Sequence, residues 1–218
     1  MRSLTMRTVR WLAAGLTLVA LTPALSAAQT SRSFNDSWFW GVKGGMISYS
    51  TAAEHNKFAP SIGAEWLITR SRGALYISGE QAFFTGTSSV SDGTFNYNVA
   101  IKDMRRYTAA LLAFPVTWGA LRPYGGIGLS MNLIQHAVLS DGVDPTTTAL
   151  LQNSINDQKD AVSFLAMAGL QAQYQRFSVF GQAGYMPMRN TSLFNGRTTY
   201  VLEGGIRINF GSSIESTP

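Results

Sequence analysis

The residues of this chain that could do chemistry are a few charged side chains set within alternating segments. In each such segment one parity is aliphatic or aromatic, and the charge falls on the other parity beside Gly, Ser, Asn or Gln. The charged residues of this kind are Lys43, Glu65, Glu80, Glu203 and Arg207. Charges that are buried together persist only when they are paired and hydrogen-bonded. The pattern therefore predicts a contiguous ion-pair network, which could serve as a gate or ion path or as a structural plug.

Groups suited to catalysis or metal binding are sparse in this sequence. It has two histidines, His55 and His136, and no cysteine. His136, Ser140 and Asp141 are the residue types of a hydrolytic triad, but a triad depends on a geometry that sequence does not supply. The glycine-rich segments contain no complete phosphate-binding fingerprint. We therefore expect no cofactor, no metal site and no enzymatic activity.

The segments that must position the charged residues alternate with a period of two, as β-strands do. The segment at 106–118 is the exception, because it is apolar on both faces. The predicted strands cover residues 38–49, 59–69, 74–86, 106–118, 123–135, 162–174, 177–187 and 198–210.

The connections between these strands are alternately short and long. Links of a few residues alternate with longer polar links at about 50–58, 87–105, 136–161 and 188–197. This rhythm is typical of an up-and-down antiparallel barrel of eight strands, with both chain ends on the short-turn side. The five charged residues then lie on neighbouring strands. Eight strands leave room for side chains but for no open channel, so the plug is favoured over the gate.

Alternation alone does not say which face of such a barrel is wet. A soluble carrier barrel buries its apolar side chains, whereas a transmembrane barrel turns them outward to lipid. Charged residues make up only 13% of the chain, against about 25% in soluble proteins. The apolar parity carries almost no charge at all. We therefore predict lipid outside and polar groups inside.

Aromatic residues near the strand ends support the same orientation, because their rings suit the two membrane interfaces. The aromatic residues assigned to this belt are Trp38, Trp40, Tyr49, Trp118, Tyr124, Tyr174, Phe177, Tyr185, Tyr200 and Phe210.

The first residues have the pattern of a secretory signal peptide. Arg2, Arg7 and Arg10 precede an uninterrupted run of apolar or small residues at 11–21, and small residues end at Ala28. The run is shorter than the ~20 residues of a membrane-spanning helix, so we expect cleavage near Ala28. The chain has 17 basic and 12 acidic residues. Without these three arginines, 14 basic residues remain, an excess of only two over the acidic ones. The high pI therefore does not indicate a nucleic-acid partner.

Three segments resemble the small eight-stranded outer-membrane β-barrels of the opacity-protein type and the membrane domain of outer-membrane protein A. They are EGGIRINF (203–210), RPYGGIGLS (122–130) and LAFPVTW (112–118). The first resembles the C-terminal assembly signal of that family. The residues that match this signal are Glu203, Gly205, Ile208 and Phe210. The resemblance implies insertion into the bacterial outer membrane by the barrel-assembly machinery.

From these observations we expect a signal peptide at 1–28, a lead-in at 29–37, an all-β transmembrane barrel at 38–211 and a polar tail at 212–218. In the segment KDMRRY, the side chains of Lys102, Arg105 and Arg106 could meet lipopolysaccharide phosphates at the outer rim, although a solvated turn fits equally well.

The expected role is that of a monomer whose partners are outer-membrane lipids and lipopolysaccharide, acting in membrane integrity or in recognition through its external loops. The alternatives are a narrow porin-like pore, a lipid A-modifying enzyme that uses His136 near the rim, and a soluble lipophilic carrier.

Overall fold

A computed structural model describes residues 33–51, 53–91, 94–139, 145–188, 193–194 and 198–212. The predicted signal peptide, residues 29–32 of the lead-in and all of the polar tail except residue 212 lie outside these ranges.

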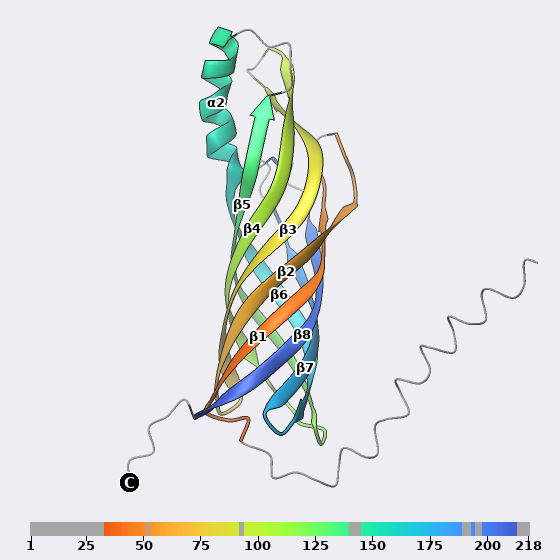
Figure 1. Ribbon diagram of the computed structural model, residues 1–218, viewed down its shortest axis with the longest axis vertical. Helices are drawn as coiled ribbons and strands as arrows, with labels where there is room; N and C mark the ends of the chain where they lie inside the picture. Colours follow the sequence, from red (N-terminus) through yellow and green to blue (C-terminus); the bar gives the residue numbers. More distant parts are fainter. Residues whose placement is uncertain are drawn as a thin grey trace, which may run out of the picture.

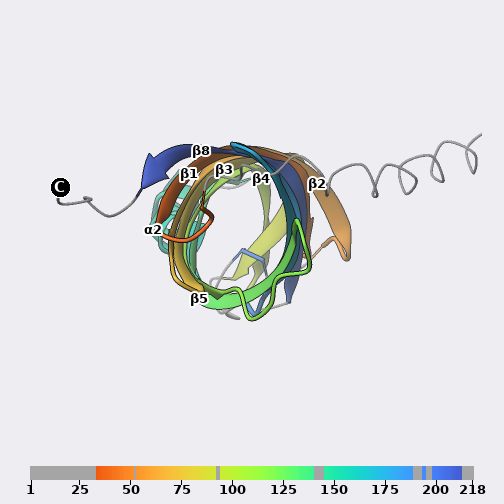
Figure 2. The same cartoon turned by 90° about the horizontal axis from the view of Figure 1, so that it is seen from below.

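The described chain forms one antiparallel barrel, in which each strand pairs with the next and β8 closes on β1. Figure 2 shows the strands as a closed ring. The strands are β1 (Ser37–Tyr49), β2 (Lys57–Arg70), β3 (Gly73–Ser91), β4 (Asn96–Ala113), β5 (Leu121–Leu139), β6 (Asp160–Tyr174), β7 (Phe177–Met186) and β8 (Thr199–Ser212). The predicted fold class is confirmed.

The short connections all lie at one end of the barrel, where β1 begins and β8 ends (Figure 1). Ser37 is the register partner of Ser212, which places the two ends of the barrel side by side. Only residues 71–72 and 175–176 separate β2 from β3 and β6 from β7. We call this the turn end and the opposite end the head.

The head is built differently from the prediction, because the β3–β4 ladder continues far beyond residue 86. Its pairing runs on to Ser91 and Asn96, so β4 begins ten residues before the predicted start at 106. Val90, Val99 and Ile101 face inward here and are almost completely buried. Apolar packing in the head therefore favours a ladder where polar neighbouring residues had suggested a loop.

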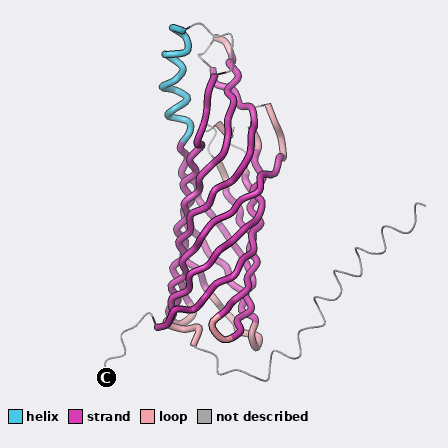
Figure 3. Tube along the Cα trace, viewed as in Figure 1, coloured by secondary structure: helices cyan, strands magenta, loops and turns pink. Residues whose placement is uncertain are grey.

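A helix, α2 (Pro145–Lys159), stands beside the head (Figure 3) and was not predicted. Leu151 and Ile155 are one turn apart and buried, so one face of the helix packs against the head. Lys159 lies in its last turn, where a cation interacts favourably with the helix dipole. Within the described residues, no helix has the length and apolarity needed to span a membrane.

The outer face of the barrel wall is apolar and the inner face is polar. Val42, Leu111 and Leu202 are at least half exposed on the outside, whereas Ser130, Gln171 and Arg207 are completely buried inside. Strand β4, whose orientation could not be predicted because both faces are apolar, turns Arg106 and Thr108 inward and Tyr107 outward. Two residues of the predicted aromatic belt, Tyr49 and Tyr124, were assigned wrongly, because both rings are buried inside the barrel.

Candidate functional site

The centre of the lumen holds a cluster of four charged side chains from β1, β3, β4 and β8. The Nζ of Lys43 lies 2.7 Å from Glu80 Oε2 and 2.9 Å from Glu203 Oε2. The Nη2 of Arg106 contacts the other oxygen of each carboxylate. All four side chains are at most 4% exposed. Each carboxylate is therefore shared by both cations.

Strand pairing explains why these four side chains meet. Glu80 and Arg106 are direct register partners on β3 and β4, so their side chains leave neighbouring backbones on the same face. Lys43 is opposite Gly205, one inward position from Glu203 on β8. The lysine and the glutamate therefore approach along the seam that closes the barrel.

A second ion pair lies nearer the turn end. The Nε of Arg207 contacts Glu65 Oε1, and its Nη1 donates a 2.7 Å hydrogen bond to Gln171 Oε1. Its guanidinium also stacks on Phe180, at 3.8 Å from the ring centroid. Gly41 lies opposite both Glu65 and Arg207 in the β1 ladders. A Cβ on this glycine would stand 3.0 Å from Arg207 Cγ, so the missing side chain leaves room for the pair.

Neutral groups lie between the charged cluster and the second pair. Tyr76 Oη accepts hydrogen bonds from Lys43 Nζ at 3.1 Å and from Gln182 Nε2 at 3.2 Å. The same Gln182 nitrogen donates to Glu203 at 2.7 Å, and its Oε1 accepts from Tyr124 at 2.8 Å. The Tyr124 ring in turn lies 5.6 Å from the Arg207 guanidinium. All five sequence-predicted network residues thus belong to one connected polar core.

Arg106 is the member of this core that sequence analysis placed wrongly. It was expected at the outer rim with Lys102 and Arg105, but it is 3% exposed and lies in the lumen. Asp103 causes the difference: it adopts φ 53° and is skipped in both ladders of β4. The inward parity of β4 changes at Asp103, opposite the register shift between Ala82 and Thr85 of β3, so Lys102 and Arg105 face outward and Arg106 faces the lumen.

A signal for Arg106 was present in the charge count. The predicted network held three carboxylates and only Lys43 and Arg207 as cations, although buried charges need partners. Arg106 supplies the third cation. Tyr76, Gln182 and Gln171 lie on the inward parity of their strands, but their hydrogen-bond partners could not be read without the register.

Apolar layers lie on both sides of the polar core. Toward the turn end, the Phe34 ring packs at an angle against Phe39 and edge-to-face against Phe114, with centroid distances of 5.6 and 4.7 Å. Toward the head, the tilted rings of Tyr49 and Phe84 have their centroids 4.5 Å apart, and Ile101 is also buried. The cavity beside the charged cluster has a volume of about 10 Å³, which holds about one water molecule.

The other predicted site residues that the structure describes are distributed over the head, the outer wall and the lumen. His136 is exposed, and its register partner is Lys102, while Ser140 and Asp141 lie outside the described residues. In the predicted assembly signal, Glu203 and Gly205 face the lumen, and Phe210 is 64% exposed on the outside near the turn end. Among the described residues, no three His, Cys, Asp or Glu side chains lie together as a metal site would require.

No protein-family model matches the sequence, and no curated protein matches it. Among solved structures, Neisserial surface protein A (NspA) is similar with a TM-score of 0.54 at 11% identity, covering 79% of this chain and 97% of that one. The N-terminal β-barrel domain of Pseudomonas aeruginosa OprF gives 0.46 at 12% identity, covering 81% and 98%. The attachment invasion locus protein Ail of Yersinia pestis, in complex with the heparin analogue sucrose octasulfate, gives 0.45 at 13% identity, covering 80% and 97%.

The likeness to NspA concerns the fold alone. It shows that the chain has the architecture of the small eight-stranded outer-membrane barrels, which confirms the resemblance drawn from the sequence.

Proposed function

We propose that the protein is a monomeric outer-membrane β-barrel with a plugged lumen, exported by a signal peptide that is cleaved near Ala28. In this proposal it acts in membrane integrity or in surface recognition through the head, and it has no enzymatic activity. Its partners are the surrounding lipids and lipopolysaccharide, together with the barrel-assembly machinery during insertion.

The apolar outer wall supports the membrane location. On β7, Phe177 and Tyr185 point outward and are eight residues apart, roughly 26 Å of extended strand. A tilt of about 40° reduces this to roughly 20 Å of height, close to the ~25 Å apolar band of outer-membrane barrels. Between them lies Val179, which is 59% exposed. A soluble carrier would turn such side chains inward.

The packing of the barrel interior is the observation that supports the plug. The polar core of paired charges spans the interior, aromatic layers lie on both sides of it, and the cavity beside it has room for about one water molecule. An ion would have to break buried ion pairs to pass, and an unpaired buried charge is costly.

Conductance across planar bilayers tests the plug against the narrow pore. We expect the refolded mature protein to insert without steady single-channel openings, because no ion path is open at rest. A larger outer-membrane porin with a water-filled channel serves as the positive control. Steady and reproducible openings of the wild-type protein would establish the pore instead.

Lys102 and Arg105 remain proposed contacts to lipopolysaccharide phosphates. Both are exposed on the outer face of β4, close to exposed His136, and Arg105 Nε bonds only weakly to Gln81 at 3.3 Å. We expect the double variant Lys102→Gln, Arg105→Gln to retain less lipopolysaccharide on purification than wild type. Equal retention would show that these residues are solvated surface and not lipopolysaccharide contacts.

The enzymatic alternative is tested by mass spectra of lipid A from cells with and without the gene.

A further inference from the structure

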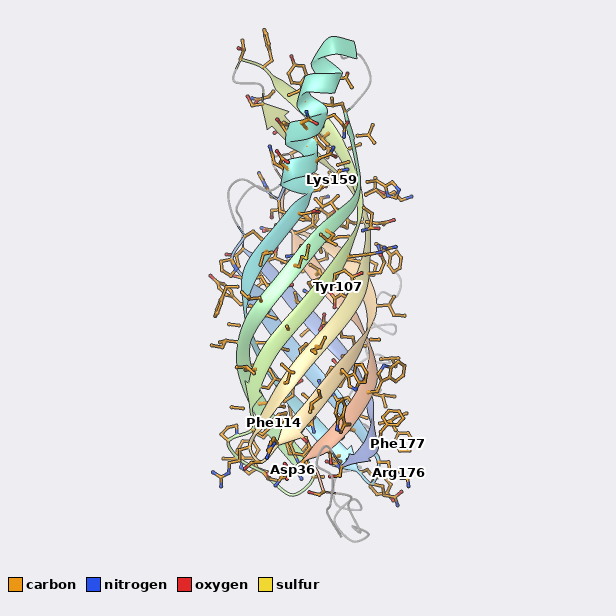
Figure 4. The ribbon with its side chains drawn as sticks, turned by 90° about the vertical axis from the view of Figure 1, so that its left-hand side faces the viewer. Asp36, Tyr107, Phe114, Lys159, Arg176 and Phe177 are labelled. Carbon is orange, nitrogen blue, oxygen red and sulfur yellow. The ribbon has the colours of Figure 1, made fainter. Side chains whose placement is uncertain are left out.

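The turn end contains an open pocket that the plug does not use. Its volume is about 500 Å³, which is within the range of small-ligand sites. The walls come from the lead-in, the β2–β3 turn, the β4–β5 connection and the start of β5. Its lining includes Phe34, Arg72, Phe114, Trp118 and Arg122. Figure 4 shows Phe114 at this end, opposite the end that carries Lys159.

Arg122 in this pocket has an unused hydrogen-bond donor. Its guanidinium lies 4.3 Å from the centroid of the Phe34 ring. Its Nε is buried and has no hydrogen-bond partner, and no ion pair to Arg122 is formed within the described ranges. Buried donors are nearly always satisfied in folded proteins. The arginine therefore lacks an acceptor that a ligand could supply.

The pocket also carries an uncompensated positive charge. Arg72 lines it from the β2–β3 turn, and its carbonyl accepts a 2.7 Å hydrogen bond from the Phe114 amide, which fixes the turn against the opposite wall. None of the described residues that line the pocket is acidic. Two cations without a counter-charge favour an anionic ligand.

The wall beside the arginines is held in place rather than loose. Phe34 is 3% exposed and packs edge-to-face on Phe114, with 4.7 Å between the ring centroids. Its carbonyl accepts a hydrogen bond from the Thr69 hydroxyl, and that Oγ1 in turn accepts one from the Ser37 amide at 3.0 Å. The ring that supports the Arg122 guanidinium is therefore preorganised, which lowers the cost of binding.

We propose that this pocket binds a phosphate group, with the guanidinium groups of Arg72 and Arg122 as its ligands. Guanidinium and phosphate form parallel charge-assisted hydrogen bonds. One arginine in the β2–β3 turn and one at the start of β5 can together donate to more oxygen atoms than a carboxylate offers, whereas a tetrahedral phosphate offers enough. The aromatic side chains beside them would contact the organic part of the ligand.

Two sources could supply this phosphate: a phospholipid head group and a soluble phosphate ester. The lipid source rests on the proposed membrane location, in which exposed Trp118 and Phe177 lie at the interface of the nearer leaflet. The soluble source does not depend on that location, because the pocket exists in the folded barrel in any environment.

Titration calorimetry on the full mature chain, folded in a non-ionic detergent, tests the site. The probes are inorganic phosphate, glycerol 3-phosphate and a short-chain phosphatidylglycerol. We expect saturable binding to the wild-type protein. Arg122→Gln should weaken the affinity by about tenfold or more, because charge-assisted hydrogen bonds are lost. Arg72→Gln should also weaken it. Arg176→Gln is the matched control, because Arg176 is exposed at the same end but does not line the pocket (Figure 4). Binding of the lipid alone would identify a head-group site, and binding of glycerol 3-phosphate as well would identify a site open to soluble esters.

Two results of this titration would overturn the proposed phosphate site. If no probe binds saturably, or if Arg176→Gln weakens binding as much as Arg122→Gln does, the pocket is not a phosphate site. Arg72 belongs to an exposed turn, so its variant keeps the test valid if Arg122→Gln does not fold; heat-modifiable gel mobility reports folding for each variant. A negative result leaves the proposed membrane function untouched, since that function is tested separately by conductance.

Discussion

At the scale of single residues, the lumen is a case of balanced buried charge. Three cations and three carboxylates share the interior, and each ionised group contacts at least one opposite charge. Replacing such a set by apolar residues can be neutral, but removing one member leaves a buried charge without a partner. Single substitutions should therefore be more damaging here than the replacement of a whole pair.

Arg106 gives the sharpest test of this balance. Arg106→Gln leaves Glu80 and Glu203 with Lys43 alone, so we expect the free energy of unfolding to fall by about 3–5 kcal/mol. Arg105→Gln is the matched control: the neighbouring side chain is exposed on the outer face, and we expect no measurable change. Urea unfolding in lipid vesicles measures both. The double variant Arg106→Gln, Glu80→Gln should recover part of the loss, because the remaining Lys43–Glu203 pair is balanced. Similar stabilities for Arg106→Gln and Arg105→Gln would contradict the buried network.

The residue scale also shows what sequence can and cannot supply. Alternation gave the facing of Lys43, Glu65, Glu80, Glu203 and Arg207, because parity alone decides which side a strand residue takes. It failed at Arg106, because the parity of β4 reverses at Asp103, opposite the register shift between Ala82 and Thr85 of β3, and this irregularity is invisible in the pattern. The pairing of Glu80 with Arg106 needed the register, which depends on the whole ladder.

At the scale of elements, the β7–β8–β1 seam depends on a small residue facing a ring. The Phe180 side chain lies across Gly205, its register partner, and a Cβ on Gly205 would stand 2.2 Å from the Val42 carbonyl oxygen of β1 and 2.8 Å from the ring. The same ring supports the Arg207 guanidinium. Phe180 therefore contacts both the closely packed part of β8 at Gly205 and the second ion pair, that of Arg207 with Glu65.

Gly205→Ala should reduce stability by about 1–3 kcal/mol, as overpacking does. Gly181→Ala on β7 is the control, because a Cβ there would meet only one atom, at 3.9 Å. Refolding into pure lipid vesicles and urea unfolding measure the effect without assembly proteins. If Gly205→Ala refolds with wild-type stability and fails only in cells, its role is in the predicted assembly signal rather than in packing.

Helix α2 should depend on one buried residue of its docking face. Ile155 is fully buried, so Ile155→Ala removes apolar contacts and leaves a cavity. We expect the helix to become sensitive to limited proteolysis while the barrel wall keeps its heat-modifiable mobility, since the head core and the lumen are separate layers. Asn156→Ala, on the exposed side of the same turn, should leave the proteolytic pattern unchanged. Resistance of the Ile155 variant would show that the helix is held elsewhere.

Element boundaries were predictable only where the strand is amphipathic. The strands at 38–49, 59–69 and 177–187 were located within two residues of the observed ends, because one face is apolar and the other polar. The start of β4 was missed by ten residues and α2 was missed entirely. Both belong to the head, where polar composition resembles that of a loop and where burial of a few side chains, such as Ile101 and Ile155, decides the structure.

At the scale of the whole molecule, the arrangement predicts an orientation. Both ends of the described barrel and all short connections lie at the turn end, and the long β3–β5 strands with α2 form the head (Figure 1). Outer-membrane barrels place short turns in the periplasm and long loops outside. The head should then face the medium and Arg176 the periplasm.

The chain has no cysteine, so single cysteines can report this orientation without background. In intact cells, a membrane-impermeant maleimide should label Asn156→Cys in α2 and should leave Arg176→Cys unlabelled until the outer membrane is permeabilised. Ile206→Cys, whose parent side chain is 49% exposed in the middle of β8, should resist the reagent in both conditions because lipid covers it. Labelling of Arg176→Cys alone in intact cells would show that the turn end, and not the head, faces the medium. Labelling of Ile206→Cys would show that water reaches the apolar outer wall. In the second case the barrel would not span a membrane, because an aliphatic outer face is stable only where hydrocarbon replaces water.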